Sequence, residues 1–585
     1  MNPVDDLTKS SGTEAGSCPS AASVDEFEAF VVTSPRSWER PIVALIVTVL
    51  AYVALIALLG GRAHLGGDTG GRAAVLRSVD TGEHAHFDVG YFALDADPDL
   101  SLHPLYYTQL LDGRAQQVST VPMVWLARPL YRLGGESLTL ALPMLGAIAA
   151  AFAASALARR LGAPRPMLAY WIVALASPVT IYALDLWEHT LGLAAGLWAI
   201  VALERPVTER LSVARAIGVG ALFGVGATLR TELLVIGAVF GGAAVLRRVV
   251  DQRHGDAVRC AVGGALGAVA VWVANDGFER IVLGASLRTA RAGDAASSAG
   301  SSLVDRVDDA WVTFAGLNYA DVGFDRALAG SFVLGLVVAT VAASRHQRFV
   351  VGAGVVVASG AIAWRLAGGL SFLPGLVVVL PLVVVGLVAG LGERRTRALT
   401  LTSAVAFVAI WLTAYSGMPG AQWGGRYLFV PGVVLVVVAT VTAVGRGFVG
   451  KVAMVLGAVV TLCGLLYLRV RIDEVSRAHD AVSDYEALEV DLMVSRLPFL
   501  WRDLGSQYSP DRAWLTAVDD EGVAEAARLA NDRSDDVVVV IREAEEPEDV
   551  LPGFEAIVED PFPWIGRNLV AVLYLADKAG AEPGV

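Results

Sequence analysis

Charged residues are scarce in this chain. They make up 18% of its 585 residues, whereas 55% are hydrophobic and the mean hydropathy is +0.57. A soluble domain of ordinary composition is about one quarter charged. The deficit excludes that class and predicts a chain that lies mostly in a lipid bilayer.

Cysteine is also rare, with three residues in the whole chain. Cys18 lies in a polar N-terminal segment, and Cys260 and Cys463 lie inside apolar runs. This placement excludes a disulfide framework. The net charge of -13 argues against a nucleic-acid partner, because such proteins carry an excess of basic residues.

Long apolar runs fill most of the sequence after residue 40. They predict about 13 transmembrane helices. The runs are 41–60, 138–158, 167–184, 189–204, 215–230, 232–247, 259–283, 326–343, 349–366, 372–391, 399–415, 427–444 and 451–468. The polar segment 1–40 is expected to be a disordered cytoplasmic tail.

Arginine is concentrated in every second loop between these runs, which predicts the orientation of the chain. Short loops that are rich in Lys and Arg stay in the cytoplasm. The basic loops contain Arg159 and Arg160, Arg205 and Arg210, Arg247 and Arg253, Arg345 and Arg348, Arg394 and Arg395, and Arg446 and Lys451. The N-terminus is therefore expected inside, and the outer loop 61–137 and the C-terminal region outside, with the plasma membrane as the expected location.

Residues 469–585 have the pattern of a small extracytoplasmic α/β domain, which follows a transmembrane domain over 41–468. Helices are expected over 485–504 and 523–529, and strands over 513–518, 537–541 and 569–575. No glycine fingerprint opens a helix here, so no nucleotide is expected. The predicted fold class is a polytopic α-helical membrane protein with this domain attached.

A glycine-rich motif, Gly66-Gly67-Asp68-Thr69-Gly70-Gly71-Arg72, follows the first run. A carboxylate at the membrane surface can accept a proton from a hydroxyl group or hold a metal ion. The structural alternative is that Asp68 caps a helix.

Acids and histidines gather further along the same outer loop. His84, His86 and Asp88 could ligate a divalent metal ion. Solvated loop polarity is the favoured alternative, because their spacing matches no diagnostic metal motif.

A second polar group lies in a short outer turn between two runs. Asp185, Glu188 and His189 fall within five residues there. Ionisable groups at this depth are costly unless they are used, and an exposed, hydrated turn is the alternative. Arg230 and Glu232, in the next outer turn, are expected to neutralise each other.

The last outer loop reads Pro419-Gly420-Ala421-Gln422-Trp423-Gly424-Gly425-Arg426-Tyr427 and leads into a run. Arginine suits phosphate binding because its planar fork offers paired donors. The alternative is that Arg426 reaches toward lipid headgroups.

At these residues the chain resembles the GT-C superfamily of membrane glycosyltransferases, which includes protein O-mannosyltransferases and the lipid A aminoarabinose transferase. The resemblance rests on Asp68 after the first run, on the element from Gln422 to Tyr427, and on many spans followed by an outer domain. Many relatives have an acidic pair where this chain has Asp68 and Thr69, and a proline at Gly425. The first departure leaves metal dependence open.

The resemblance implies an inverting transferase that uses a polyprenyl-phosphate sugar and a hydroxyl acceptor. It implies that Asp68 is the base and Arg426 the phosphate ligand. The implied substrate pocket comprises Asp185, Glu188, His189, Gln422, Trp423 and Tyr427. The sugar, the acceptor and the cofactor stay open, with a divalent metal ion as one alternative.

Two other classes of function also stay open. A transporter or flippase of a lipid-linked sugar would have similar spans, and a non-catalytic membrane scaffold could display the C-terminal domain. A transporter should not need an outer carboxylate for turnover, and a scaffold should tolerate the loss of Asp68 and Arg426.

Overall fold

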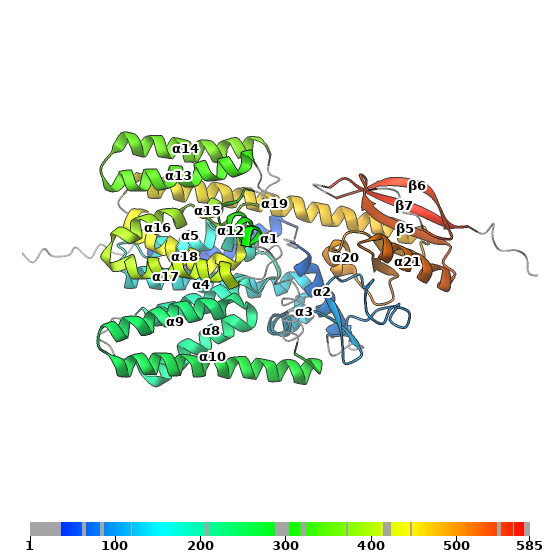
Figure 1. The fold of residues 1–585 in the computed structure, drawn as a ribbon, viewed down its shortest axis with the longest axis horizontal. Coiled ribbons are helices and arrows are strands. Elements are labelled where there is room, and N and C mark those ends of the chain that lie inside the picture. Colours follow the sequence, from blue (N-terminus) through cyan, green and yellow to red (C-terminus); the bar gives the residue numbers. More distant parts are fainter. Residues whose placement is uncertain are drawn as a thin grey trace, which may run out of the picture.

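The computed structural model consists of a helical bundle and a smaller α/β part at one end of it (Figure 1). It describes residues 37–60, 66–81, 87–118, 120–204, 210–286, 303–317, 323–369, 373–413, 423–444, 447–546, 551–564 and 567–577. The predicted tail 1–40 lies outside these ranges up to residue 36, and a short 3-10 helix, η1 (Ser37–Glu39), precedes the first span.

Nine helices within the described ranges are long and apolar enough to cross a membrane. They are α1 (Pro41–Leu58), α4 (Ala141–Arg160), α9 (Glu232–Val250), α10 (His254–Leu283), α13 (Phe324–Ser344), α14 (Arg348–Ala367), α17 (Arg394–Thr413), the run Arg426–Val444 that contains η2 (Arg426–Leu428), α18 (Phe429–Ala439) and η3 (Thr440–Val444), and α19 (Phe448–Ala487). Three shorter apolar helices accompany them: α7 (His189–Leu203), α8 (Val213–Leu229) and α16 (Leu382–Gly392). The multi-pass helical membrane class is therefore confirmed, and the number of crossings stays a prediction.

Many large apolar side chains on the outside of the bundle are exposed. On α1, Ile42, Leu50 and Leu58 are 72%, 62% and 76% exposed. A soluble protein would not display such a row, whereas lipid tails cover it at no cost.

Two of the predicted continuous spans are broken, which corrects the sequence prediction. The run 167–184 forms α5 (Met167–Leu175) and α6 (Pro178–Tyr182), and the run 372–391 forms α15 (Leu376–Val379) and α16. A proline stands at each break: Pro178 is the first residue of α6, and Pro381 directly precedes α16. Proline lacks the N–H that continues the helical ladder and clashes with the preceding turn.

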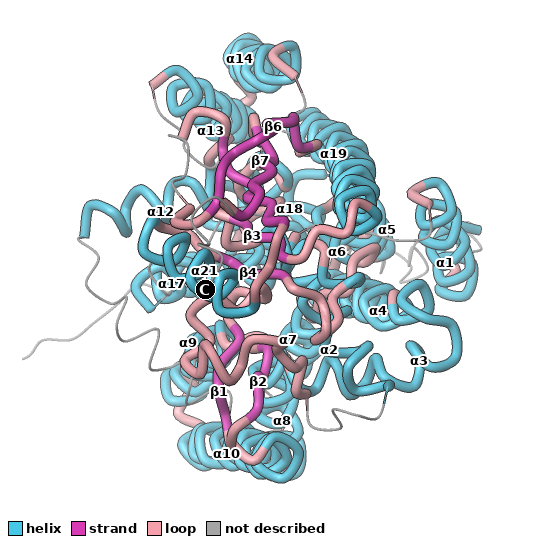
Figure 2. Tube along the Cα trace, turned by 90° about the vertical axis from the view of Figure 1, so that its right-hand side faces the viewer, coloured by secondary structure: helices cyan, strands magenta, loops and turns pink. Residues whose placement is uncertain are grey.

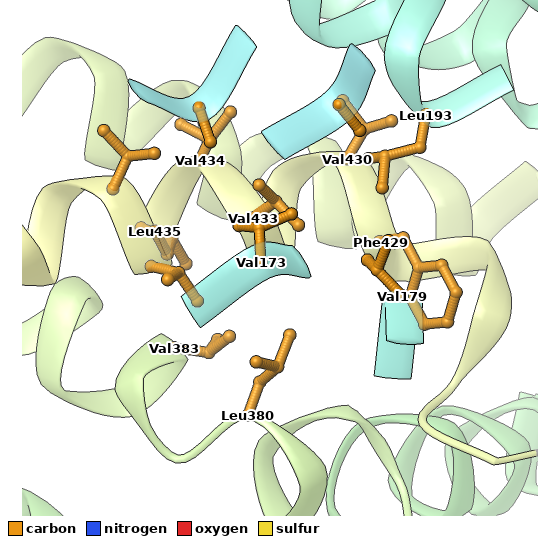
Figure 3. Close-up of a cluster of buried hydrophobic side chains, with 14 of the residues drawn as sticks. Val173, Val179, Leu193, Leu380, Val383, Phe429, Val430, Val433, Val434 and Leu435 are labelled. Atoms are coloured by element: carbon orange, nitrogen blue, oxygen red, sulfur yellow. The ribbon is translucent and has the colours of Figure 1, made fainter. Parts of the chain in front are cut away.

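Helix α18 lies at the centre of the bundle, and every one of its residues is buried. Figure 3 shows Val430, Val433 and Leu435 of this helix packed among side chains of the broken segments, such as Val173 and Leu380. Arg426 lies in η2, directly before this fully buried helix, so its backbone is anchored in the centre of the bundle.

The predicted outer loop after α1 contains α2 (Gly67–Thr81), a hairpin of β1 (Thr108–Leu111) and β2 (Arg114–Gln117), and α3 (Val121–Thr139). A further amphipathic helix, α12 (Leu303–Ala315), precedes α13.

Helix α19 continues beyond the bundle and leads into the C-terminal α/β domain (Figure 1). Its elements are β3 (Leu492–Ser495), α20 (Leu500–Asp503), η4 (Gly505–Gln507), β4 (Trp514–Thr516), α21 (Asp520–Arg533), β5 (Val537–Glu543), β6 (Phe554–Phe562) and β7 (Leu569–Ala576). The sheet order is β4-β3-β5-β7-β6, with β3 parallel to both neighbours and the remaining pairs antiparallel.

The predicted helix over 485–504 is wrong. Its first residues end α19, its centre is strand β3, and only its last residues form α20. A four-residue strand that is buried on both faces shows no alternation, so periodicity cannot distinguish it from a buried helix.

The outer loop and the C-terminal domain share one hydrophobic core, which joins Val75 and Phe87 of the loop to Trp501 and Leu515 of the domain. The view from this end shows the strands lying across the bundle (Figure 2). The basic connections α9–α10 and α13–α14 lie at the opposite end (Figure 1), as the alternation of arginines requires.

Candidate active site

Asp68 lies in the first turn of α2, between two arginines from distant parts of the chain. Its Oδ2 is 3.4 Å from Nη1 of Arg426, and its Oδ1 is 2.8 Å from Nη2 of Arg502. The side chain is 26% exposed. Asp68 is the second residue of the helix rather than its N-cap, and its carboxylate pairs with guanidinium groups.

Arg426 is directed toward Asp68 by a glycine turn. Gly424 and Gly425 have φ of 84° and 60°, in the left-handed region. A Cβ atom on Gly425 would lie 2.3 Å from the carbonyl oxygen of Thr313. Only glycine fits this position, because a side chain would meet that carbonyl and few other residues adopt the positive φ.

Aromatic rings fix the Arg426 guanidinium. It lies 5.1 Å from the ring centre of Trp187 and 5.0 Å from that of Tyr427, and Nη2 donates to the Tyr427 hydroxyl at 3.1 Å. Cation–π contacts hold arginine without using all its hydrogen-bond donors. The guanidinium can therefore still bind an anion.

A network of buried ion pairs lies close to Asp68 and Arg426. Glu188, only 2% exposed, accepts from Nη2 of Arg72 at 2.5 Å and from Nη1 of Arg230 at 3.2 Å. Arg230 also contacts Glu232 at 3.0 Å through Nε. The expected pairing of Arg230 with Glu232 is confirmed, and Glu188 is its second carboxylate partner.

Asp185 joins the short outer turn to α2. Its Oδ1 accepts from the hydroxyl of Thr69 at 2.7 Å and from the backbone N–H of Leu186 at 2.8 Å, and Thr69 in turn accepts from Nε1 of Trp187 at 2.7 Å. Thr69 thus links α2 to the turn that carries Trp187 and Glu188.

A small, half-open pocket adjoins Arg426, and the cavity inside it has a volume of only about 10 Å³. Both polar and apolar side chains line it. The polar members are His189, Arg230, Glu232, Arg426 and Tyr427, and the apolar members are Leu193, Leu233, Ile236, Phe429 and Val430.

His189 is buried in the wall of this cavity. Its ring stacks on Trp187 with centres 4.8 Å apart, and neither ring nitrogen has a hydrogen-bond partner among the described residues. A buried polar group without a partner is costly, so it marks a place where a ligand or water binds.

Three other residues of the predicted pocket do not line this cavity. Trp423 is fully buried and stacks on Tyr467 with ring centres 5.5 Å apart, and its carbonyl accepts from the hydroxyl of Tyr182. Asp185 and Glu188 are also absent from its wall. Gln422 is outside the described residues.

No family model matches the sequence, and no curated protein matches it. Solved structures that match the chain weakly include ArnT from Cupriavidus metallidurans bound to undecaprenyl phosphate, with 13% identity, a TM-score of 0.44, and coverage of 90% of this chain and 97% of that one. The oligosaccharyltransferase of Archaeoglobus fulgidus, in complex with Zn and sulfate, shows 12% identity, a TM-score of 0.44, and coverage of 85% and 67%.

Identities and TM-scores of this size do not assign an activity, so the geometry of the site has to carry that assignment.

Electrostatics keep Asp68 ionised. Partial burial by itself raises the pKa of its carboxyl, but the nearby guanidinium groups of Arg502, Arg72 and Arg426 outweigh this effect and hold the pKa well below its usual value. The resting carboxylate is thus negatively charged at every physiological pH, and its affinity for a proton rises only if one of these cations moves away.

The weak metal candidates do not assemble within the described residues. His84 and His86 lie outside them, and Asp88 accepts from the backbone N–H groups of Gly90 at 2.9 Å and Ala115 at 3.2 Å. No group of three or more His, Cys, Asp or Glu side chains in the described ranges is placed to hold a metal ion.

Sequence reasoning missed two arginines of this site. Arg72 is the last residue of the glycine-rich motif, and its proximity to Asp68 was the one available signal. Arg502 lies in a segment predicted as a continuous helix, where nothing local distinguishes it from a surface arginine.

Proposed function

We propose that the protein is a membrane glycosyltransferase that moves a sugar from a polyprenyl-phosphate donor to a hydroxyl acceptor at the outer face of the plasma membrane. One observation carries the proposal. Asp68 and Arg426, 358 residues apart in sequence, form an ion pair, and Arg426 lines a pocket together with a second arginine and several apolar side chains. A base for the acceptor and a cation for the leaving group are what this transfer requires.

The residues that line the pocket carry the groups that a lipid phosphate needs. Arg426, Arg230 and His189 can supply hydrogen-bond donors, and Leu233, Ile236 and Val430 supply apolar surface. The guanidinium fork can bind two phosphate oxygens at once. The proposal thus places the phosphate at Arg426 and the first isoprene units against the apolar side chains.

The chemistry follows from this placement. Asp68 accepts the proton of the acceptor hydroxyl while its oxygen bonds to the anomeric carbon of the sugar. The bond between that carbon and the phosphate oxygen breaks, and Arg426 stabilises the departing lipid phosphate. A single displacement inverts the configuration at the anomeric carbon.

Donor binding also prepares the base. The incoming phosphate competes with Oδ2 of Asp68 for Arg426, which frees that carboxylate oxygen and raises its proton affinity. The substrate therefore activates Asp68 only when a leaving group is in place.

The experiment is an incubation of the purified protein in detergent or nanodiscs with a panel of polyprenyl-phosphate sugars and candidate acceptors. Release of free polyprenyl phosphate together with a glycosylated acceptor is expected. A flippase would move the intact lipid-linked sugar across liposomes without releasing the lipid phosphate. That result, obtained with every donor tested, would refute the transferase assignment.

A further inference from the structure

The C-terminal domain contributes a side chain to the candidate active site. Arg502, in α20, contacts Oδ1 of Asp68 at 2.8 Å, closer than the 3.4 Å that separates Arg426 from Oδ2. The Arg502 side chain is 8% exposed, and its guanidinium lies 5.1 Å from the ring centre of Tyr107.

The glycines of the motif make this contact possible. A Cβ atom on Gly70 would lie 2.1 Å from the carbonyl oxygen of Arg502, and one on Gly505 would lie 2.3 Å from the carbonyl oxygen of Gly70. The two backbones therefore approach closely only because both positions are glycine. The motif around Asp68 thus receives the C-terminal domain on this side.

A second ion pair fixes α20 to the helix that leads into the domain. Nη2 of Arg471, on α19, is 3.1 Å from Oδ2 of Asp503, and its guanidinium lies 5.2 Å from the ring centre of Trp564. Arg502 is therefore held by its neighbours on both sides, unlike Arg426, whose guanidinium borders the cavity.

We propose that Arg502 is the fixed cation of this centre: it orients Asp68 through Oδ1 and occupies the side of the carboxylate where a divalent metal ion would otherwise bind. The inference rests on the proposed function, in which Asp68 is the base. Arg502 is then a positioning residue, which stays with Asp68 when donor phosphate draws Arg426 away.

The surroundings of Asp68 do not suit a divalent cation. The groups that face it are the guanidiniums of Arg72 on its own helix, Arg426 at the start of the α18 run, Arg502 on α20 and, farther off, Arg230. A dication there would be repelled by all of them. Glu188 is paired with two arginines, and Asp185 already accepts two hydrogen bonds.

The test compares Arg502→Met and Arg502→Lys with the matched control Arg77→Met. Arg77 is an exposed residue of α2 whose Nη1 donates to the carbonyl of Ser506 at 3.1 Å, so it joins the same two segments without contacting Asp68. Each protein is assayed for kcat, for donor KM and for the pH dependence of kcat/KM.

For Arg502→Met we expect kcat to fall on the order of a hundredfold, because misplacing a reacting group by about 1 Å has that effect. Donor KM should change by less than about twofold, because Arg426 remains to bind the phosphate. Without Arg502 the Asp68 pKa rises toward its usual value, so the acid limb of the pH profile should move to higher pH. Arg502→Lys keeps the charge and should keep the wild-type profile with part of the activity, and Arg77→Met should match the wild type.

Two results would overturn the proposal: an Arg502→Met enzyme with wild-type kcat and pH profile, or wild-type turnover that EDTA abolishes and Mn²⁺ or Mg²⁺ restores. If Arg502→Met does not fold, Arg502→Lys decides. Lysine keeps the positive charge, so an acid limb that moves away from the wild-type position contradicts the fixed-cation role. The pair itself is tested without turnover by a thermal-unfolding cycle of Asp68→Asn, Arg502→Lys and the double variant. If the two substitutions change the free energy of unfolding additively, Asp68 and Arg502 do not interact, and the proposal fails. This measurement needs no sugar donor, so it distinguishes a failure of the Arg502 proposal from a failure of the proposed function.

Discussion

Replacing Asp68 with asparagine should move donor binding and turnover in opposite directions. Asparagine keeps the shape of the side chain but removes both the negative charge and the basic site. In the resting protein the carboxylate pairs with Arg426 at 3.4 Å, with side-chain exposures of 26% and 15%. Donor phosphate has to displace that pairing before it can bind Arg426 fully.

The expected magnitudes follow from this geometry. A partly exposed ion pair contributes about 0.2–1 kcal/mol, so its removal should tighten binding of a polyprenyl phosphate by about 1.5- to 5-fold. Loss of the general base should slow transfer by at least about a hundredfold. A variant that binds its donor more tightly but hardly turns over is the signature of a base that competes for the phosphate ligand.

The assay measures polyprenyl phosphate binding by tryptophan fluorescence or calorimetry, and lipid phosphate release under saturating donor. Asp80→Asn is the matched control, because Asp80 lies on the same helix and pairs with Arg132 at 2.7 Å away from the site. Near-normal turnover of Asp68→Asn would refute the base assignment and direct attention to Glu188 and Asp185. Weaker donor binding by Asp68→Asn would refute the competition between carboxylate and phosphate.

The remaining predictions concern the phosphate ligand, the docking of the domain and the topology. Arg426→Lys should keep only part of the donor affinity, because an ammonium group lacks the paired donors of the guanidinium fork, and Arg426→Ala should lose more. Equal donor binding by the wild type and Arg426→Ala would instead support contact of Arg426 with lipid headgroups. Gly70→Ala should lower the free energy of unfolding by about 1–3 kcal/mol, because the new Cβ atom meets the backbone of Arg502. Thermal unfolding measures this change, and Gly264→Ala is the control because a Cβ atom there meets no atom within 4 Å. A cysteine at Val518, 50% exposed in the C-terminal domain, should react with an impermeant thiol reagent in intact cells and one at Arg253 should not, whereas the reverse labelling would invert the predicted orientation.

The composition and the short motifs of the sequence were enough to predict the membrane class and a C-terminal domain with a small sheet. These predictions are confirmed because hydropathy and strand patterns are local signals, readable within a window of about 20 residues. The orientation of the chain and the roles of Asp68 and Arg426 stay predictions. The breaks at Pro178 and Pro381 were also local, yet the apolar runs around them are long enough to conceal them.

Tertiary structure decided which charges meet. Asp68 acquires its partners from the α18 run and from α20, and Glu188 is shared by Arg72 and Arg230, across separations that leave no periodic trace in the sequence. An ion pair depends on the positions of a few atoms within about 4 Å, whereas hydropathy averages over a whole helix. The sequence therefore determined where the chain meets lipid, and only the folded chain determined that Arg502 of the C-terminal domain holds the carboxylate of the first outer loop.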